Sequence, residues 1–238
     1  MTQLIDPYFL LEIFLKLIEY IPVTLGLAIS SMFFASVLGL VVMLIRLKKI
    51  PFLSKLADAY VLLGRALPTM VILYIVFFAL PIFLMIFSET TGTKIDFNQI
   101  PATVFAVIGL TLHTGAYLTE AFRAAVQSVE KGQMEAAYSI GMTWWQGFYR
   151  IILRQAAVFA MPLMVNQFLN LIKGTSIAFM ITVMELFGAA NVICADNNRY
   201  LEVYIVVAGI YWGMSILFEK LFLVIENKLA FFKKGVNE

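Results

Sequence analysis

Long apolar stretches separated by short polar segments dominate this chain. A helix needs roughly 20 apolar residues to cross about 30 Å of hydrocarbon. Stretches of that length lie at about 22–45, 66–88, 102–124, 160–187 and 203–227. An earlier run from Tyr8 to Ile18 is interrupted by Glu12 and Lys16, which predicts an amphipathic helix at the membrane interface. The pattern therefore predicts an all-α membrane protein with about five transmembrane helices.

The composition agrees with this fold class. Of 238 residues, 62% are hydrophobic and 13% are charged, whereas soluble domains average about 45–50% apolar and about 25% charged residues. We expect residues 1–238 to form a single membrane domain that lies in the lipid bilayer. We expect no nucleic-acid partner. The start of the chain carries Asp6 and Glu12 instead of basic residues, which predicts that it has no cleaved signal peptide.

The distribution of basic residues predicts the orientation, because Lys and Arg stay on the cytoplasmic side during insertion. With the N-terminus outside, only Lys16, Lys94 and Arg199 lie outside. The cytoplasmic side then receives Arg46, Lys48, Lys49, Lys55, Arg65, Arg123, Lys131, Arg150, Arg154, Lys228, Lys233 and Lys234. This asymmetry predicts an external N-terminus and a cytoplasmic C-terminus. It also places the polar segment at about 124–158, between the third and fourth stretches, in the cytoplasm.

That polar segment has a distinctive local pattern. Glu135-Ala136-Ala137 favours a helix, and Gly141 suits the left-handed position that ends one. We predict a short helix, a sharp turn, and a second helix that carries Trp144 and its aromatic neighbours back to the bilayer. The alternative is an interfacial amphipathic helix in which Glu-Ala-Ala occurs by chance.

The segment resembles the coupling loop, or EAA loop, of ATP-binding-cassette (ABC) importer permeases. It is most similar to the polar amino-acid uptake family, whose pattern is roughly E-x-x-R, G-Q-x-E-A-A-x-x-L-G-M and L-P-Q-A. The matching residues are Glu120, Arg123, Gly132, Gln133, Glu135, Ala136, Ala137, Gly141, Met142, Gln155 and Ala156. The chain departs from the pattern at Arg154, where Pro is usual, and at Ala124-Ala125, where Gly-Gly is common.

The resemblance implies a type I ABC importer fold with a cytoplasmic coupling helix. It implies contact with an ATPase through the motif residues Gly132, Glu135, Ala136, Ala137, Gly141 and Met142. The chain lacks G-x-x-x-x-G-K-[ST], the loop that binds nucleotide phosphates, so we expect no cofactor and no catalytic residues in it. ATP and Mg²⁺ would be bound by a separate ATPase subunit.

Polar residues inside the fourth stretch are candidates for a substrate pathway, because polar groups are costly in hydrocarbon. The run from Asn166 to Ile177 resembles the family's N-x-x-x-x-x-x-K-D-T-S-L, with Gly174 in place of Asp. Asn166, Asn170 and Lys173 recur at steps of four and three residues and therefore share one helix face. Gly174 beside Lys173 would allow an irregular backbone there.

Within this candidate pathway, two opposite charges would suit an amino acid. Lys173 with Thr175 and Ser176 would hold an α-carboxylate, and Glu185 would meet an α-ammonium group. The alternative is that these residues make structural contacts or gate the path. Arg65, which precedes Pro68 in a stretch similar to the family's Y-x-x-x-F-R-G-T-P, joins the candidate set, although an interfacial anchor is its simplest role.

The remaining chemistry-bearing residues are few. A single cysteine, Cys194, excludes an internal disulfide, and a single histidine, His113, excludes an all-histidine metal site, so we expect no bound metal. His113 and Glu120 lie seven residues apart on one helix face, either along the pathway or packed between helices.

We therefore predict the permease subunit of an ATP-driven amino-acid importer in the bacterial cell membrane. Its expected partners are two copies of an ATP-binding subunit, a second permease that is identical or paralogous, and an extracellular substrate-binding protein. That protein would dock on the outer loops at about Glu89–Ile100 and Ala189–Glu202. The alternative is that these loops are simply hydrated turns. The alternatives are an ion-coupled secondary carrier and a membrane-embedded enzyme. The sequence leaves open which amino acid is carried and whether the two permeases are identical.

Overall fold

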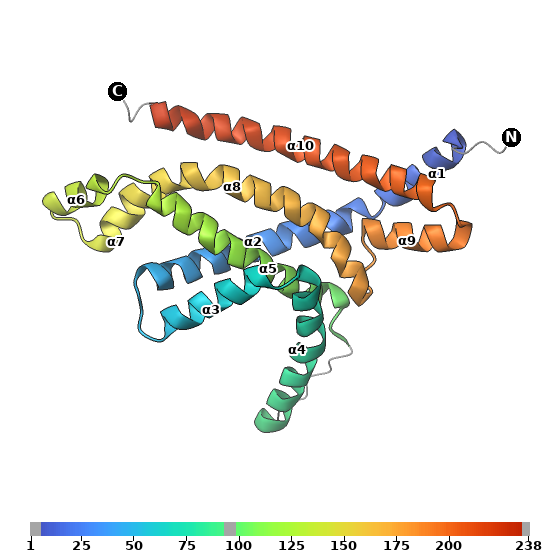
Figure 1. The fold of residues 1–238 in the computed structure, drawn as a ribbon, viewed down its shortest axis with the longest axis horizontal. Helices are drawn as coiled ribbons and strands as arrows, with labels where there is room; N and C mark the ends of the chain where they lie inside the picture. Colours follow the sequence, from blue (N-terminus) through green and yellow to red (C-terminus); the bar gives the residue numbers. More distant parts are fainter. Residues whose placement is uncertain (1–5, 93–98, 235–238) are drawn as a thin grey trace.

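The computed structural model describes residues 6–92 and 99–234, and their regular structure is helical (Figure 1). A π-helical turn (Phe148–Ile152) precedes α8, and a 3-10 helix (Thr175–Ile181) follows it. The α-helices are α1 (Pro7–Ile18), α2 (Ile21–Leu47), α3 (Leu53–Ala66), α4 (Thr69–Thr91), α5 (Ala102–Gln127), α6 (Gly132–Ser139), α7 (Trp144–Gly147), α8 (Leu153–Gly174), α9 (Leu186–Asn197) and α10 (Tyr200–Lys234).

Five helical segments of the described chain are long and apolar enough to cross a membrane, which confirms the prediction of five spans. They are α2, α4, α5, α10 and the combined segment Trp144–Ile181. Helices α2, α5, α8 and α10 run along one elongated bundle, with α6 and α7 at one end and α1 and α9 at the other (Figure 1). The start of α1 and the end of α10 lie at opposite ends of the bundle, as an odd number of crossings requires.

The fourth span differs from the prediction at both ends. Helix α8 begins at Leu153 and continues the π-helical turn, so the span starts before residue 160. It ends before residue 187, because Thr182 adopts a left-handed conformation with φ of 67°. Residues 189–197, predicted as part of the outer loop Ala189–Glu202, instead belong to α9. The exposed residues Asp196 and Asn197 give the end of α9 the composition of a loop. Leu186, Ala190 and Cys194 are nevertheless buried at a helical spacing of four residues.

The other outer loop was predicted at about residues 89–100. Helix α4 reaches Thr91 and Gly92 then takes a left-handed conformation, so the first of these residues are helical. Residues 93–98 lie outside the described residues.

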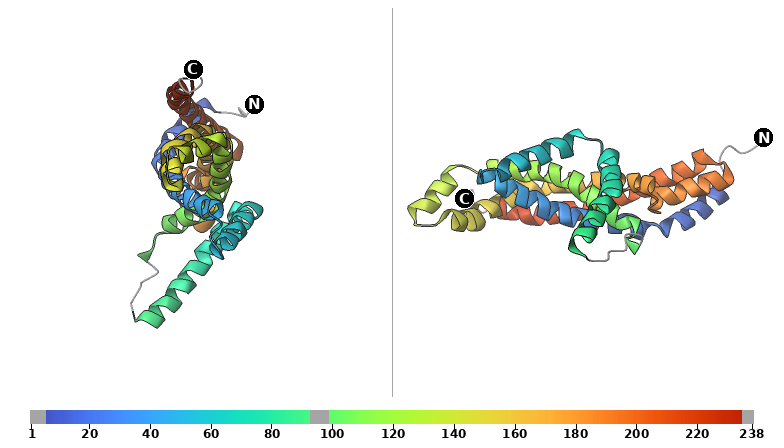
Figure 2. Two further views of the ribbon diagram at one scale, coloured as in Figure 1. Left: turned by 90° about the vertical axis from the view of Figure 1, so that its left-hand side faces the viewer. Right: turned by 90° about the horizontal axis from the view of Figure 1, so that it is seen from below.

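The second span also starts later than predicted. Arg65, which directly precedes the predicted start of this span, belongs to the separate helix α3. The break falls at Leu67, whose ψ of 142° is extended, because a residue that precedes proline avoids the helical region. Helix α4 then starts after Pro68 and leaves the bundle at an angle (Figure 2). Of its side chains, only Ile72, Leu73 and Val76 are buried.

Helix α5 forms the centre of the bundle and is closely approached by α2 and α3. A Cβ atom added to Gly39 of α2 would lie 3.0 Å from Leu118 Cβ of α5. A Cβ atom on Gly64 of α3 would lie 2.6 Å from Ala116 Cβ, which no ordinary contact allows. Small residues at these crossings let the helix backbones come close, as membrane helix packing requires.

The amphipathic helix predicted near the N-terminus is present as α1. Asp6 caps it by accepting a hydrogen bond from the Tyr8 backbone N–H at 3.0 Å. Its buried side chains, Ile13 and Leu17, belong to the apolar core that includes residues of α9 and α10. Its position at a membrane interface stays a prediction.

Candidate coupling loop and polar face

The loop between α5 and α8 has the predicted helix–turn–helix shape. Helix α6 ends in a turn at Gly141, whose φ of 79° is left-handed. The backbone N–H of Gly141 donates to the Tyr138 carbonyl oxygen at 2.9 Å, and that of Met142 donates to the Ala137 carbonyl oxygen at 3.0 Å. Thr143 then caps α7 through a reciprocal pair of hydrogen bonds with Gln146. Backbone hydrogen bonds therefore stabilise the turn, and a capping box starts the helix that follows it.

The motif residues of the loop divide into an exposed set and a packed one. Gly132, Glu135, Ala136 and Gly141 are exposed, and Met142 is half-buried. Ala137 is only 1% exposed and lies against Gly147 of α7, where an added Cβ would be 3.1 Å from Ala137 Cβ. Ala137 thus holds α6 against α7, while Glu135 and Ala136 form an outward surface.

An aromatic and cationic contact joins the loop to the end of α2. The ammonium group of Lys48 lies 3.1 Å from the ring centroid of Trp144 and 5.0 Å from that of Trp145. Trp144 also stacks on Phe148 of the π-helical turn, with ring centroids 4.8 Å apart. No pattern in the sequence predicts a role for Lys48. Its contact with Trp144 joins residues far apart along the chain, which no local pattern reports.

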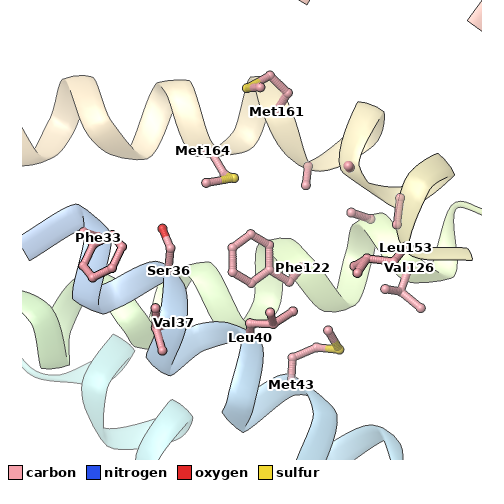
Figure 3. A pocket seen from close by; sticks show the side chains of 14 residues that line it. Phe33, Ser36, Val37, Leu40, Met43, Phe122, Val126, Leu153, Met161 and Met164 are labelled. Atoms are coloured by element: carbon pink, nitrogen blue, oxygen red, sulfur yellow. The ribbon is translucent and has the colours of Figure 1, made fainter. Parts of the chain in front are cut away.

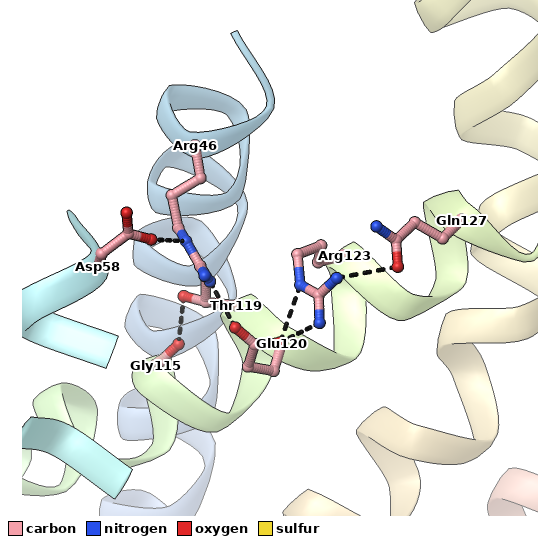
Figure 4. A network of polar contacts seen from close by, with 7 residues as sticks. All are labelled: Arg46, Asp58, Gly115, Thr119, Glu120, Arg123 and Gln127. Carbon is pink, nitrogen blue, oxygen red and sulfur yellow. Dashed lines mark hydrogen bonds and ion pairs between the residues drawn. The ribbon is translucent and has the colours of Figure 1, made fainter. Parts of the chain in front are cut away.

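A network of charged side chains ties α2, α3 and α5 together near the same end of the bundle (Figure 4). Arg46 donates from Nε to Asp58 Oδ1 at 2.6 Å and from Nη1 to Glu120 Oε1 at 2.5 Å. Glu120 Oε2 accepts from Arg123 Nη2 at 2.7 Å. Glu120 is therefore held by two guanidinium groups, so its geometry agrees with packing between helices.

His113 also makes a contact between helices. Its Nε2 lies 3.0 Å from Thr69 Oγ1 of α4, and its ring lies 5.1 Å from that of Tyr117. Of the two readings that the sequence left open for His113 and Glu120, these contacts favour packing.

The structure places Asn166, Asn170 and Lys173 together on an exposed face of α8, hereafter the polar face. Lys173 makes no ion pair with any other described residue. The regular helix stops at Gly174, one residue later, and continues as a 3-10 helix, as the glycine predicted. Two amides and an ammonium group on a membrane-spanning helix require a neighbour other than lipid.

The remaining residues of the candidate pathway lie on the 3-10 helix that follows α8, at the end of α3 and at the start of α9. Thr175 is buried and donates its hydroxyl to the Ile172 carbonyl oxygen at 2.8 Å, and Ser176 donates to the Lys173 carbonyl oxygen at 2.8 Å. Arg65 is exposed at the end of α3, 5.7 Å from the Tyr117 ring centroid.

Glu185 is fully buried and caps α9. Its carboxylate accepts hydrogen bonds from the Gly188 N–H at 2.7 Å, from the Tyr211 hydroxyl at 3.1 Å and from the Thr24 hydroxyl at 3.5 Å. Lys173 and Glu185 therefore do not share an exposed surface, because Lys173 is exposed on α8 and Glu185 is buried at the start of α9.

Residues 32–231 match the family model described as binding-protein-dependent transport system inner membrane component. The chain belongs to this family. It is 41% identical to the probable amino-acid permease protein YxeN of Bacillus subtilis (strain 168), over 90% of this chain and 91% of the relative. It is 40% identical to the L-cystine transport system permease protein TcyL of the same organism, over 90% of this chain and 87% of the relative.

Solved structures agree with this membership. One described as an amino acid ABC transporter with histidines has a TM-score of 0.74 and 29% identity, covering 90% of this chain and 98% of that one. An inward-facing MetNI methionine ABC transporter has a TM-score of 0.71 at 18% identity, which shows the fold alone, and covers 90% of this chain and 95% of that one.

The chain is therefore a multi-pass membrane permease of the ABC importer type. Family membership supports this function and does not support the ion-coupled carrier that the sequence left as an alternative.

Proposed function

We propose that this chain is the permease subunit of an ATP-driven amino-acid importer in the bacterial cell membrane. The names of the relatives support the substrate class, since they include a probable amino-acid permease and an L-cystine permease. The structural observation that carries the proposal is the polar face of α8. It lies in a membrane-spanning segment, is exposed in a single chain, and would be covered by a second permease around a shared pathway.

The coupling loop would receive the motion of a separate ATPase that binds ATP and Mg²⁺. Glu135 and Ala136 present an exposed surface at the tip of the bundle, on the helix α6 that Ala137 holds against α7. Helix α7 continues through the π-helical turn into α8, so a displacement of the loop is passed directly to the helix that carries the polar face. Two permeases would therefore engage two ATPase copies.

In this scheme the exposed residues of the polar face act on the substrate, and the residues whose polar groups are bonded within the chain stabilise the helices around it. Lys173 would attract the α-carboxylate, with Asn166 and Asn170 as hydrogen-bonding neighbours along the path. Thr175, Ser176 and Glu185 would support the turn that follows, since their polar groups are bonded within the chain. An external binding protein would dock at the other end of the bundle, near the exposed residues Asp196 and Asn197 of α9.

ATP binding would draw the two coupling loops together and rock the two bundles from an inward-facing to an outward-facing arrangement. The binding protein would then release its amino acid between the two polar faces. ATP hydrolysis would return the bundles to the inward-facing arrangement and free the substrate on the cytoplasmic side.

The test is reconstitution of the permease with its ATPase and binding protein in vesicles. We expect amino-acid uptake that requires ATP, and ATP hydrolysis that the loaded binding protein stimulates. Uptake driven by an ion gradient in the absence of the ATPase would contradict the proposal. Uptake of a different class of solute would leave the permease role intact and overturn the amino-acid assignment.

A further inference from the structure

An apolar groove runs along the bundle between α2 and α8, with α5 as its floor (Figure 3). One part has a volume of about 360 Å³ and a second part about 390 Å³. The two parts share Phe33, Ser36, Met161 and Met164, so they form a single groove. Ser36 is its only polar lining residue, and the Ser36 hydroxyl already donates to the Met32 carbonyl oxygen at 2.7 Å. The groove wall therefore suits an apolar ligand.

The groove has one closed end. On α8 its lining residues run from Leu153 to Phe168, which is about 22 Å at 1.5 Å per residue. Phe168 meets Phe218 and Phe222 of α10 there, with ring centroids 5.3 and 5.6 Å apart. A hydrocarbon core of about 30 Å is longer than the groove, so the groove does not cross the whole bilayer. A transmembrane helix of a second permease would run past this wall, whereas a single acyl chain ends before it.

The groove also faces away from the polar face. At about 100° per residue, Ala157 in the groove and Lys173 on the polar face lie about 160° apart around α8. If the polar face meets the second permease, the groove turns toward lipid.

Positive charge flanks the open end of the groove. Arg150 and Arg154 lie on either side of the lining residue Leu153, both are exposed, and neither makes an ion pair with another described residue. By contrast, Arg46 and Arg123 are occupied by Glu120. Two exposed guanidinium groups without an ion pair to another described residue at this end of the groove suit an anionic lipid headgroup.

We propose that the groove binds one phospholipid of the leaflet on the coupling-loop side. One acyl chain lies between α2 and α8, and an anionic headgroup is held by Arg150 and Arg154. The flexible side chains of Met161 and Met164 shape the wall around the chain. The lipid thereby fills the space beneath the coupling loop and supports the start of α8. This inference rests on the proposed function in one respect, that the polar face meets a second permease, and it holds whether or not the amino-acid assignment is right.

The test is native mass spectrometry of the permease–ATPase complex, purified after incorporation into vesicles of phosphatidylethanolamine and phosphatidylglycerol. We expect the wild type to retain one phosphatidylglycerol for each permease chain. Ala157→Phe fills the groove and should remove it, whereas Ala208→Phe, at an exposed position of α10 outside the groove, should retain it. Equal retention by these two variants would overturn the proposal.

A second pair of variants keeps the groove open and changes only charge. Arg150→Gln with Arg154→Gln should weaken retention of phosphatidylglycerol by on the order of tenfold, while Lys49→Gln with Lys55→Gln, the same change in net charge, should not. Equal weakening by both pairs would show a general surface potential instead of a site. Loss of one permease copy in Ala157→Phe, with lipid retention unchanged, would show that the second permease fills the groove and would also overturn the proposal.

Discussion

At the scale of single residues, Gly141 gives the loop its turn. Its φ of 79° is left-handed, and no atom lies within 4 Å of an added Cβ, so a substitution there meets backbone strain and no steric clash. Gly141→Val should cost about 1–2 kcal/mol in the loop. Gly141→Asn should cost less, because asparagine tolerates the left-handed region. We expect the valine variant to lose binding-protein-stimulated ATP hydrolysis and the asparagine variant to keep most of it. Equal hydrolysis by both would mean that the turn conformation does not matter for coupling.

Glu135 tests the outward surface of the loop. It lies in the first turn of α6, where a carboxylate also favours the helix by about 0.3–1 kcal/mol. Glu135→Lys should leave the permease inserted and folded but separate ATP hydrolysis from uptake, because the reversed charge repels the ATPase surface. Glu135→Gln removes the same helix stabilisation without the repulsion and should transport better than the lysine variant. Normal uptake by Glu135→Lys would place the contact with the ATPase elsewhere.

Lys173 tests the polar face. Methionine is close in shape to the lysine stem, so Lys173→Met removes the charge and leaves packing nearly unchanged. We expect uptake to fall at least tenfold, with ATPase assembly and docking of the binding protein retained; tenfold corresponds to about 1.4 kcal/mol in transport free energy of activation. Asn170→Ala, one turn away on the same face, removes a polar group and no charge. A smaller loss of uptake in this variant than in Lys173→Met would assign the effect to the charge. If Lys173→Met transports like the wild type, substrate specificity belongs to the external binding protein.

At the scale of helices, the contact between α2 and α7 fixes how the loop sits on the bundle. A cation above an aromatic ring contributes about 0.5–2 kcal/mol, depending on its exposure to water. Lys48→Met should therefore loosen α7 and speed amide hydrogen exchange in residues 143–148, with less uptake for each ATP hydrolysed. Lys48→Arg preserves the cation and should restore both. Lys55→Met, on the exposed side of α3, is the control and should change neither.

Helices with long apolar runs could be predicted from the sequence, and helices defined by contacts could not. The five spans follow from hydrophobicity alone, and the turn at Gly141 follows from its local pattern. Helix α9 was missed because Asp196 and Asn197 make its end look like a hydrated loop, although Glu185 caps its start. The partners of Lys48 and Glu185 lie on other helices, so no spacing within one segment reports them.

At the scale of the whole molecule, the expected membrane orientation can be measured with one label. Cys194 is fully buried, so Cys194→Ser provides a background without native thiols. In that background, Asn197→Cys on α9 should react with a membrane-impermeant maleimide from outside intact cells. Ser139→Cys on α6 should react only after the membrane is opened, because both residues are exposed but lie at opposite ends of the bundle. The reverse pattern would place the coupling loop outside and rule out an ATPase partner in the cytoplasm.

The π-helical turn at Phe148–Ile152 determines how the coupling loop is rotated around the axis of α8. Such a turn holds one residue more than an α-helical turn, and one residue of an α-helix corresponds to about 100° of rotation. Removing a single residue from it would swing α6 about the α8 axis, while every side chain of the span stayed in place. When the loop of one permease is grafted onto another, the number of residues in this turn therefore matters more than their identity. We expect a chimera that keeps all five residues to preserve the orientation of its grafted loop, and a chimera one residue shorter to rotate that loop by about 100° around α8.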